Sequence, residues 1–122
     1  MAKILIIDDD RQFRVMLKQM LERSGYQIIE GESADEGLKK CQDPDIGLLL
    51  LDMITPGRDG LEILDDLRAL RPEMKIIAMS GGVKGDTSWL EPIAMSKGVC
   101  RFMAKPFSKA EIMSAINEVL GA

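Results

Sequence analysis

At 122 residues the chain has the length of one domain, and its 46% hydrophobic and 30% charged residues are typical of a folded rather than a disordered protein. Its net charge of −4 argues against direct binding of nucleic acid, whose phosphates favour a basic surface. The sequence contains no histidine, which excludes Ser-His-Asp and Cys-His catalysis and most zinc sites, so any chemistry must use carboxylates, hydroxyls and lysines.

The first predicted element is a strand at 3–7, where a short apolar run is followed by three aspartates. A segment with helical periodicity comes next, with an apolar stripe expected to face the core and charged side chains expected to face away from it. The stripe consists of Phe13, Met16, Leu17, Met20 and Leu21. The outward-facing set consists of Arg11, Arg14, Lys18 and Glu22. Gly25 lies where a C-terminal glycine ends a helix.

Four further apolar runs predict strands at 26–30, 46–51, 75–79 and 100–104. Three of the five runs, at 4–7, 46–51 and 76–79, are nearly continuous rather than alternating, which is typical of parallel strands that are covered on both faces. Apolar residues at helical spacing predict three more helices. They are Ala34, Leu38 and Cys41; Leu61, Leu64 and Leu67; and Ile112, Ile116, Val119 and Leu120.

Side chains that cap helices mark several of the predicted helix starts. The pairs are Ser33 with Glu36 and Ser108 with Glu111, which fit the capping box, and Asp59 with Glu62, an acidic variant.

The segment 81–98 is predicted to be a long loop followed by a helix of about two turns that ends at Gly98. Trp89 falls at the junction of that loop and helix.

The predicted order is therefore a strand and a helix, repeated five times along the chain. Because such crossovers are right-handed, they build an open, doubly wound sheet of five parallel strands with helices on both faces. The sequence shows no internal repeat, linker or low-complexity tract, so we expect a single α/β domain over residues 1–122.

No targeting or membrane-spanning segment is recognisable. The N-terminus does not resemble a signal peptide, and no apolar run approaches the ~20 residues of a membrane span. Cys41 and Cys100 match no metal-ligand or redox spacing, and we expect both to be reduced and half-buried. We therefore expect a cytoplasmic protein that does not associate with a membrane.

Polar side chains stand at the ends of four of the predicted strands. Asp8 and Asp9 follow the first strand, Asp52 the third, Ser80 the fourth and Lys105 the fifth. In doubly wound sheets, ligands bind outside the carboxyl ends of the strands, so we expect these groups to share one rim.

The acids at that rim favour a divalent cation. Two carboxylates about 4 Å apart repel each other by roughly 4 kcal/mol at an effective dielectric constant of about 20, so a cluster of Asp8, Asp9 and Asp52 needs a proton or a cation to relieve it. Oxygen ligands without histidine or cysteine favour Mg²⁺ or Mn²⁺ over zinc. With such a cation and Lys105 present, a phosphoryl group can approach Asp52, the best-placed nucleophile. Asp10 is expected only to cap the first helix.

Each of these residues also has an ordinary structural explanation. Asp52 fits a turn, Ser80 precedes a glycine-rich turn, and a lysine such as Lys105 is most often exposed to solvent. The functional interpretation depends on four strand ends carrying complementary groups at once.

Four segments also carry a resemblance: KILIIDDD at 3–10, LLLLDMITPG at 48–57, IIAMSG at 76–81 and MAKPF at 103–107. In this order, and over essentially the whole chain, they resemble the receiver domain of two-component response regulators. The resemblance implies a flavodoxin-like sheet with the strand order 2-1-3-4-5.

The resemblance also implies a role for each residue at the rim. Asp52 matches the phosphoacceptor, Asp9 the acid that binds Mg²⁺ directly, and Asp8 the acid that acts mostly through bound water. The backbone carbonyl of Ile54 would complete the protein's metal ligands.

Three further residues match the phosphoryl pocket and the switch of that family. Ser80 matches the hydroxyl that bonds the phosphoryl oxygen, and Lys105 matches the ammonium that pairs with it. Phe102 occupies the aromatic switch position, whose ring would turn inward as Ser80 moves. The Lys105–Pro106 bond resembles one that is cis in the family.

The sequence departs from the family pattern at two positions that flank the phosphoryl pocket. Ile54 is apolar there and Gly82 has no side chain. We expect these residues to tune dephosphorylation without deciding whether phosphorylation occurs. The segment 81–98 is also a few residues longer than the pattern implies.

The mechanism that the resemblance implies is a two-state switch. A sensor histidine kinase or a histidine phosphotransfer protein would supply phosphohistidine, and repacking of Phe102 would bias the face formed by the fourth helix, fifth strand and fifth helix. The other expected partner is a downstream target protein or an output domain, with no direct contact to nucleic acid.

No enzyme activity is expected beyond self-phosphoryl transfer and autodephosphorylation. The chain is expected to be either a stand-alone receiver that works through protein contacts or an excised piece of a longer protein.

Three other classes share parts of this pattern. A flavin-binding electron carrier would need a loop rich in Ser, Thr and Gly after the first strand, where this chain has three aspartates. A phosphatase with an aspartyl-phosphate intermediate would usually need a second acid two residues after the nucleophile, where this chain has Ile54. A degenerate receiver would lack part of the acid set, which is intact here.

Overall fold

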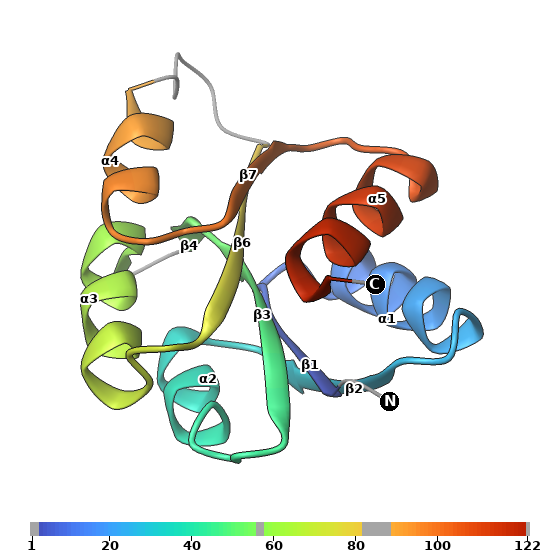
Figure 1. Ribbon diagram of the computed structural model, residues 1–122, viewed down its shortest axis with the longest axis horizontal. Coiled ribbons are helices and arrows are strands. Elements are labelled where there is room, and N and C mark those ends of the chain that lie inside the picture. The colour runs from blue at the N-terminus through green and yellow to red at the C-terminus, as the bar shows by residue number, and fades with distance from the viewer. Residues whose placement is uncertain (1–2, 56–57, 82–88, 122) are drawn as a thin grey trace.

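The computed structural model describes residues 3–55, 58–81 and 89–121. Its centre is a parallel sheet of five strands in the order β2-β1-β3-β6-β7, with helices on both faces (Figure 1). The strands are β1 (Lys3–Ile7), β2 (Gln27–Gly31), β3 (Ile46–Asp52), β6 (Lys75–Ser80) and β7 (Arg101–Ala104). The helices are α1 (Arg11–Arg23), α2 (Ala34–Lys40), α3 (Gly60–Leu70), α4 (Leu90–Ser96) and α5 (Lys109–Leu120). Because β6 and β7 are the fourth and fifth strands of this sheet, the predicted order 2-1-3-4-5 and the doubly wound α/β class are confirmed.

Burial on both faces of the sheet explains the nearly continuous apolar runs. Successive side chains of a strand point to opposite faces. In β1, Leu5 and Ile7 belong to the core shared with α2, α3 and α4, whereas Ile4 and Ile6 belong to the core shared with α1 and α5. All four side chains are fully buried. Figure 1 shows the same two layers of helices on either side of the sheet.

A short antiparallel hairpin follows β3, where the sequence predicts no strand. It pairs β4 (Ile54–Thr55) with β5 (Arg58–Asp59). Asp59 then caps α3 as predicted, although its carboxylate accepts a hydrogen bond from the N–H of Leu61, at 3.0 Å, and not from that of Glu62. At the start of the hairpin, the N–H of Ile54 donates to the carboxylate of Asp52, two positions earlier in the chain.

The two predicted capping boxes have different outcomes. Ser108 and Glu111 form both hydrogen bonds of the box. Ser33 accepts a hydrogen bond from the N–H of Glu36, but the Glu36 carboxylate accepts one from the N–H of Glu32 instead of that of Ser33. The prediction of a complete box at Ser33 is therefore wrong. The same Glu36 oxygen also accepts a hydrogen bond from a lysine of the next helical turn, which competes for it.

Helices α1 and α4 both end at a glycine with positive φ, where a Cβ would be strained. These are Gly25, at 96°, and Gly98, at 88°. Helix α4 is thus the short helix that the sequence predicts before Gly98, and Trp89 lies at its N-cap. Gly82 belongs to 82–88, which lies outside the described residues.

The predicted faces of α1 are wrong at two positions. Arg14, expected to face solvent, is only 3% exposed, and Met16, expected in the core, is 46% exposed. Arg14 shares the buried face with Leu17 and Leu21, because spacings of three and four residues place side chains on one side of a helix. A buried guanidinium needs polar partners, which Arg14 finds at the rim of the sheet.

The two cysteines are free thiols, as expected, but neither is half-buried. Cys41 is fully buried because it ends α2 on the core side, and Cys100 is exposed because it precedes β7 at the edge of the sheet. Within the described residues, no helix has the length and apolar character that crossing a membrane requires.

Gly60→Ala is expected to lower the free energy of unfolding by about 1–3 kcal/mol, the usual cost of overpacking. A Cβ on Gly60 would lie 2.3 Å from the carbonyl oxygen of Met53, which is backbone and cannot swing away. Urea denaturation measures the effect. Gly47→Ala is the matched control, because a Cβ there meets nothing within 4 Å. Equal stability of the two variants would contradict this prediction.

Candidate functional site

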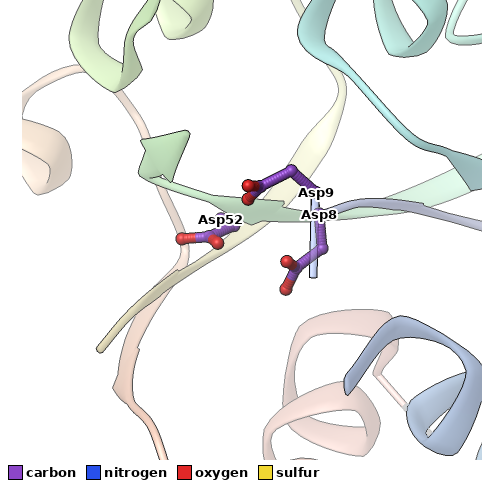
Figure 2. A group of neighbouring side chains, drawn as sticks. All are labelled: Asp8, Asp9 and Asp52. Carbon is purple, nitrogen blue, oxygen red and sulfur yellow. The ribbon is translucent and has the colours of Figure 1, made fainter. Parts of the chain in front are cut away.

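The residues singled out at the strand ends do meet at one rim. Asp8 and Asp9 follow β1, Asp52 ends β3 and Ser80 ends β6, and Lys105 directly follows β7. The parallel register aligns these ends, because Asp52 lies beside Met79 on β6 and Ser80 lies beside Ala104 on β7. Figure 2 shows the three aspartates projecting from the ends of β1 and β3 into a common space.

The three aspartates are close enough to share one ion. Asp8, Asp9 and Asp52 each contribute a carboxylate oxygen, and these oxygens lie within 4.8 Å of one another. Asp8 is fully buried and Asp52 is 4% exposed, whereas Asp9 is exposed. Because like charges at this separation repel, and because the ligands are hard oxygens, the cluster could hold a divalent cation.

Lys105 supplies positive charge to the same cluster. Its Nζ donates hydrogen bonds to Asp8 Oδ2 at 2.7 Å and to Asp52 Oδ2 at 3.3 Å. The ammonium also lies 4.0 Å from the centre of the Phe13 ring, which attracts a cation through its face. Phe13 in turn packs edge-to-face against Phe107. One ammonium against three carboxylates leaves the site negatively charged.

Contacts from several elements hold Asp8 in place. Its Oδ1 accepts a hydrogen bond from the N–H of Asp10 at 2.9 Å, and its own N–H donates to the carbonyl of Gly31 at the end of β2. Its carbonyl oxygen accepts a hydrogen bond from Arg14 Nη1 at 2.7 Å. Asp10 caps α1, as predicted, by accepting a hydrogen bond from the N–H of Phe13.

The carboxylate of Asp52 is buried and has a raised pKa. Its Oδ1 accepts a hydrogen bond from the N–H of Ile54 at 3.0 Å. Burial raises the pKa of Asp52 from its ordinary value of 3.8 to about 6; the hydrogen bond from Ile54 opposes the rise, the charge of Asp8 adds to it and that of Lys105 opposes it. Asp52 is therefore mostly ionised at neutral pH, the form in which a carboxylate can act as a nucleophile.

Ser80, Phe102 and Ile54 lie around this cluster. Ser80 is 3% exposed, and its carbonyl accepts a hydrogen bond from the N–H of Lys105 at 2.7 Å, which ties the ends of β6 and β7 together. Phe102 lies on β7 beside Ala78 of β6 and packs, half-buried, against the core under α2, α3 and α4. Ile54 is half-buried at the start of the hairpin. Their predicted roles in metal binding and switching remain predictions.

In the described part of the chain, two side chains outside the predicted set contact the site. They are Arg14, which binds the Asp8 carbonyl, and Phe13, which lies against the Lys105 ammonium. For Arg14 the sequence does contain a signal, since its spacing to Leu17 and Leu21 is that of a buried helical face. For Phe13 there is no local signal, because Lys105 comes from the other end of the chain.

Comparison with known proteins identifies a family. Residues 4–117 match the family model described as the response regulator receiver domain. The alkaline phosphatase synthesis transcriptional regulatory protein PhoP of Bacillus subtilis is 30% identical over 118 residues, which are 97% of this chain and 48% of that protein. The chain spans about half the length of the first curated relatives that it matches.

Solved structures show the same architecture. A CheY-like response regulator receiver domain protein from Methanospirillum hungatei superposes with a TM-score of 0.90 at 30% identity, over 99% of this chain and 94% of that one. The response regulator TrrA of Thermotoga maritima, solved in complex with Mg²⁺ and BeF, superposes with a TM-score of 0.83 at 27% identity, over 98% and 99% of the two chains.

The raised pKa of Asp52 predicts that Asp52→Asn stabilises the metal-free protein. A carboxyl whose pKa is higher in the folded state costs stability once it ionises, so its cost appears as pH rises from 3.8 and is complete above about 6. At neutral pH the variant should gain up to about 3 kcal/mol in unfolding free energy, at about 1.4 kcal/mol per pKa unit. The gain should shrink toward about pH 4. Urea denaturation in the presence of a chelator checks this, and a gain that does not change with pH would contradict it.

Proposed function

The chain belongs to the response regulator receiver domain family, and we propose that it accepts a phosphoryl group on Asp52 from a phosphohistidine donor and thereby switches a protein-interaction surface. As a receiver it is a phosphoacceptor regulatory domain and not an enzyme in the usual sense. The observation that carries the proposal is the contact of one lysine with two buried aspartates, next to a third aspartate, at the carboxyl ends of the strands.

In the proposed transfer, Asp52 is the nucleophile. An oxygen of its carboxylate forms a bond to phosphorus while the bond from phosphorus to the donor's imidazole nitrogen breaks, and that nitrogen keeps the electron pair and takes up a proton. The ammonium of Lys105, 3.3 Å from Asp52, is placed to neutralise charge on the phosphoryl oxygens. The hydroxyl of Ser80, at the end of the next strand, would then bond a phosphoryl oxygen.

The residues present fit a Mg²⁺ or Mn²⁺ ion at the same rim. Asp9 and Asp52 would bind it directly, Asp8 through water, and the backbone carbonyl of Ile54 would complete the protein ligands. When bound, the ion neutralises the carboxylates and the oxygens of the incoming phosphoryl group. Two observations support this assignment: the carboxylate oxygens of the three acids lie within 4.8 Å of one another, and TrrA was solved with Mg²⁺.

The proposed switch runs from Ser80 to Phe102. Movement of Ser80 toward the phosphoryl group would make room for the half-buried ring of Phe102, which lies on the neighbouring strand. Repacking there would bias the face formed by α4, β7 and α5. Exposed apolar side chains on and next to α4 support a protein-binding role for this face. They are Trp89 at 57%, Ile93 at 39% and Met95 at 41% exposure.

The proposed partners follow from this chemistry. Since the chain contains no histidine, a phosphohistidine donor must lie outside it. We propose that a sensor histidine kinase or a histidine phosphotransfer protein supplies the phosphoryl group. The receiving partner is a downstream target protein or an output domain, consistent with the names of relatives such as PhoP, of which this chain matches about half. We place the protein in the cytoplasm and propose that this chain itself does not contact nucleic acid.

Phosphorylation tests the proposal directly. With Mg²⁺ and a small phosphodonor such as acetyl phosphate, the wild-type protein should gain the mass of one phosphoryl group, whereas Asp52→Asn should gain none. The fluorescence of Trp89, at the N-cap of α4, should change in parallel in the wild type only. Mass spectrometry and fluorescence measure the two effects. A wild type that gains no mass, or a variant that gains the same mass, would refute the assignment of Asp52.

The lifetime of the phosphorylated protein should depend on Ile54. An apolar side chain beside the phosphoryl group cannot orient an attacking water, so Ile54→Asn is expected to speed dephosphorylation about fivefold, the rate equivalent of one hydrogen bond of about 1 kcal/mol. First-order loss of phosphate from purified phosphoprotein measures this. Ile54→Val, which keeps the position apolar, is the control and should leave the lifetime unchanged. The same lifetime in all three proteins would count against the prediction.

A further inference from the structure

Arg14 is buried although a charge in the core is costly. Four polar or charged residues are buried in the part of the chain that the structure describes, and three of them, Asp8, Asp52 and Ser80, belong to the rim already described. The fourth is Arg14, at 3% exposure. A buried charge is tolerated only with polar partners, so the contacts of Arg14 show what it is placed to hold.

The guanidinium of Arg14 bridges two strand ends. Its Nη1 donates to the main-chain carbonyl oxygen of Asp8 at 2.7 Å, and its Nε donates to Glu30 Oε1 on β2 at 3.0 Å. The fork of the guanidinium makes both bonds at once, which a lysine ammonium on its flexible stem cannot reproduce with the same geometry. Arg14 therefore fixes the Asp8 carbonyl relative to the sheet.

That carbonyl belongs to the peptide unit that joins Asp8 to Asp9. A peptide unit is planar, so fixing its carbonyl oxygen fixes the direction in which the chain enters Asp9. The Asp9 carboxylate itself has no hydrogen bond or ion pair with any residue that the structure describes. The backbone therefore sets the direction of its Cα–Cβ bond, from which the carboxylate extends toward Asp52, as Figure 2 shows.

We infer that Arg14 is a positioning residue for divalent-cation binding, which holds the Asp8–Asp9 peptide so that the carboxylate of Asp9 meets that of Asp52. The inference rests on the proposed metal site. The inference adds that Mg²⁺ binding also requires Arg14, a residue that would contact neither the ion nor the phosphoryl group. Partners that orient metal ligands in this way commonly change metal affinity by about 10–100-fold when they are removed.

The direction in which the affinity for Mg²⁺ changes when Arg14 is replaced separates this positioning role from two other roles. Removal of a positive charge near a cation site would by Coulomb's law alone tighten Mg²⁺ binding. A purely structural role would lower stability and leave the affinity of the folded protein unchanged. Only a positioning role predicts weaker binding of Mg²⁺ by a folded variant that has lost a positive charge.

The experiment measures the Kd for Mg²⁺ alone by isothermal titration calorimetry, and stability by urea denaturation, in wild type and Arg14→Met. The Kd of the variant should rise about tenfold. Arg71→Met is the matched control, because Arg71 also donates to backbone carbonyls, those of Cys41, Asp43 and Ile46, but at the opposite end of the sheet. It should lose stability and keep the Kd of wild type. If Arg14→Met does not fold, Arg14→Lys replaces it and should also raise the Kd, since it keeps the charge without the fork.

The outcomes are distinct. A higher Kd in the Arg14 variant, with the Kd of the Arg71 variant unchanged, supports the inference. An unchanged or lower Kd in the Arg14 variant, with normal binding by wild type, overturns the inference and leaves the proposed function standing. A wild type that binds no Mg²⁺ overturns the proposed metal site, and this inference falls with it.

Discussion

The crowding of negative charge at one end of the sheet is the constraint on which the rest of the site depends. Asp8, Asp9 and Asp52 bring carboxylate oxygens within 4.8 Å of one another, and two of these acids are buried. Lys105 offsets part of this charge through its hydrogen bonds to two of these acids, Asp8 and Asp52. Folding therefore assembles an unfavourable arrangement that a bound cation would relieve, and it leaves the Asp52 carboxylate mostly ionised at neutral pH beside the Lys105 ammonium.

Sheet topology makes this crowding possible. Strands β1, β3, β6 and β7 are neighbours in the sheet and run parallel, so their carboxyl ends form one edge although they are far apart in the chain. Lys105 reaches Asp8 across a sequence separation of 97 residues. The residues directly after β3 add a local contribution, because the N–H of Ile54 donates to the carboxylate of Asp52.

The first turn of α1 forms a second layer behind the acids. Asp10 caps the helix, Phe13 lies against the Lys105 ammonium, and Arg14 binds the carbonyl of Asp8. The N-cap residue and two residues at the start of this helix thus contact the loop after β1 and the lysine after β7. The same arrangement explains why the helix buries an arginine, whose polar partners lie at this rim.

The sequence by itself determined the five strands of the sheet, the helix ends at Gly25 and Gly98, and the acids, hydroxyl and lysine at the strand ends, because apolar runs, caps and turn glycines are local signals. The strand order came from the family resemblance. Only the tertiary structure decided that Arg14 is buried, that Phe13 lies against a lysine from the other end of the chain, and that a hairpin follows β3. The burial of Arg14 and the contact of Phe13 depend on partners from other strands, and a local pattern carries no information about which such group will satisfy a charge. The hairpin pairs nearby residues, but its two strands of two residues each are too short to show a strand pattern in the sequence.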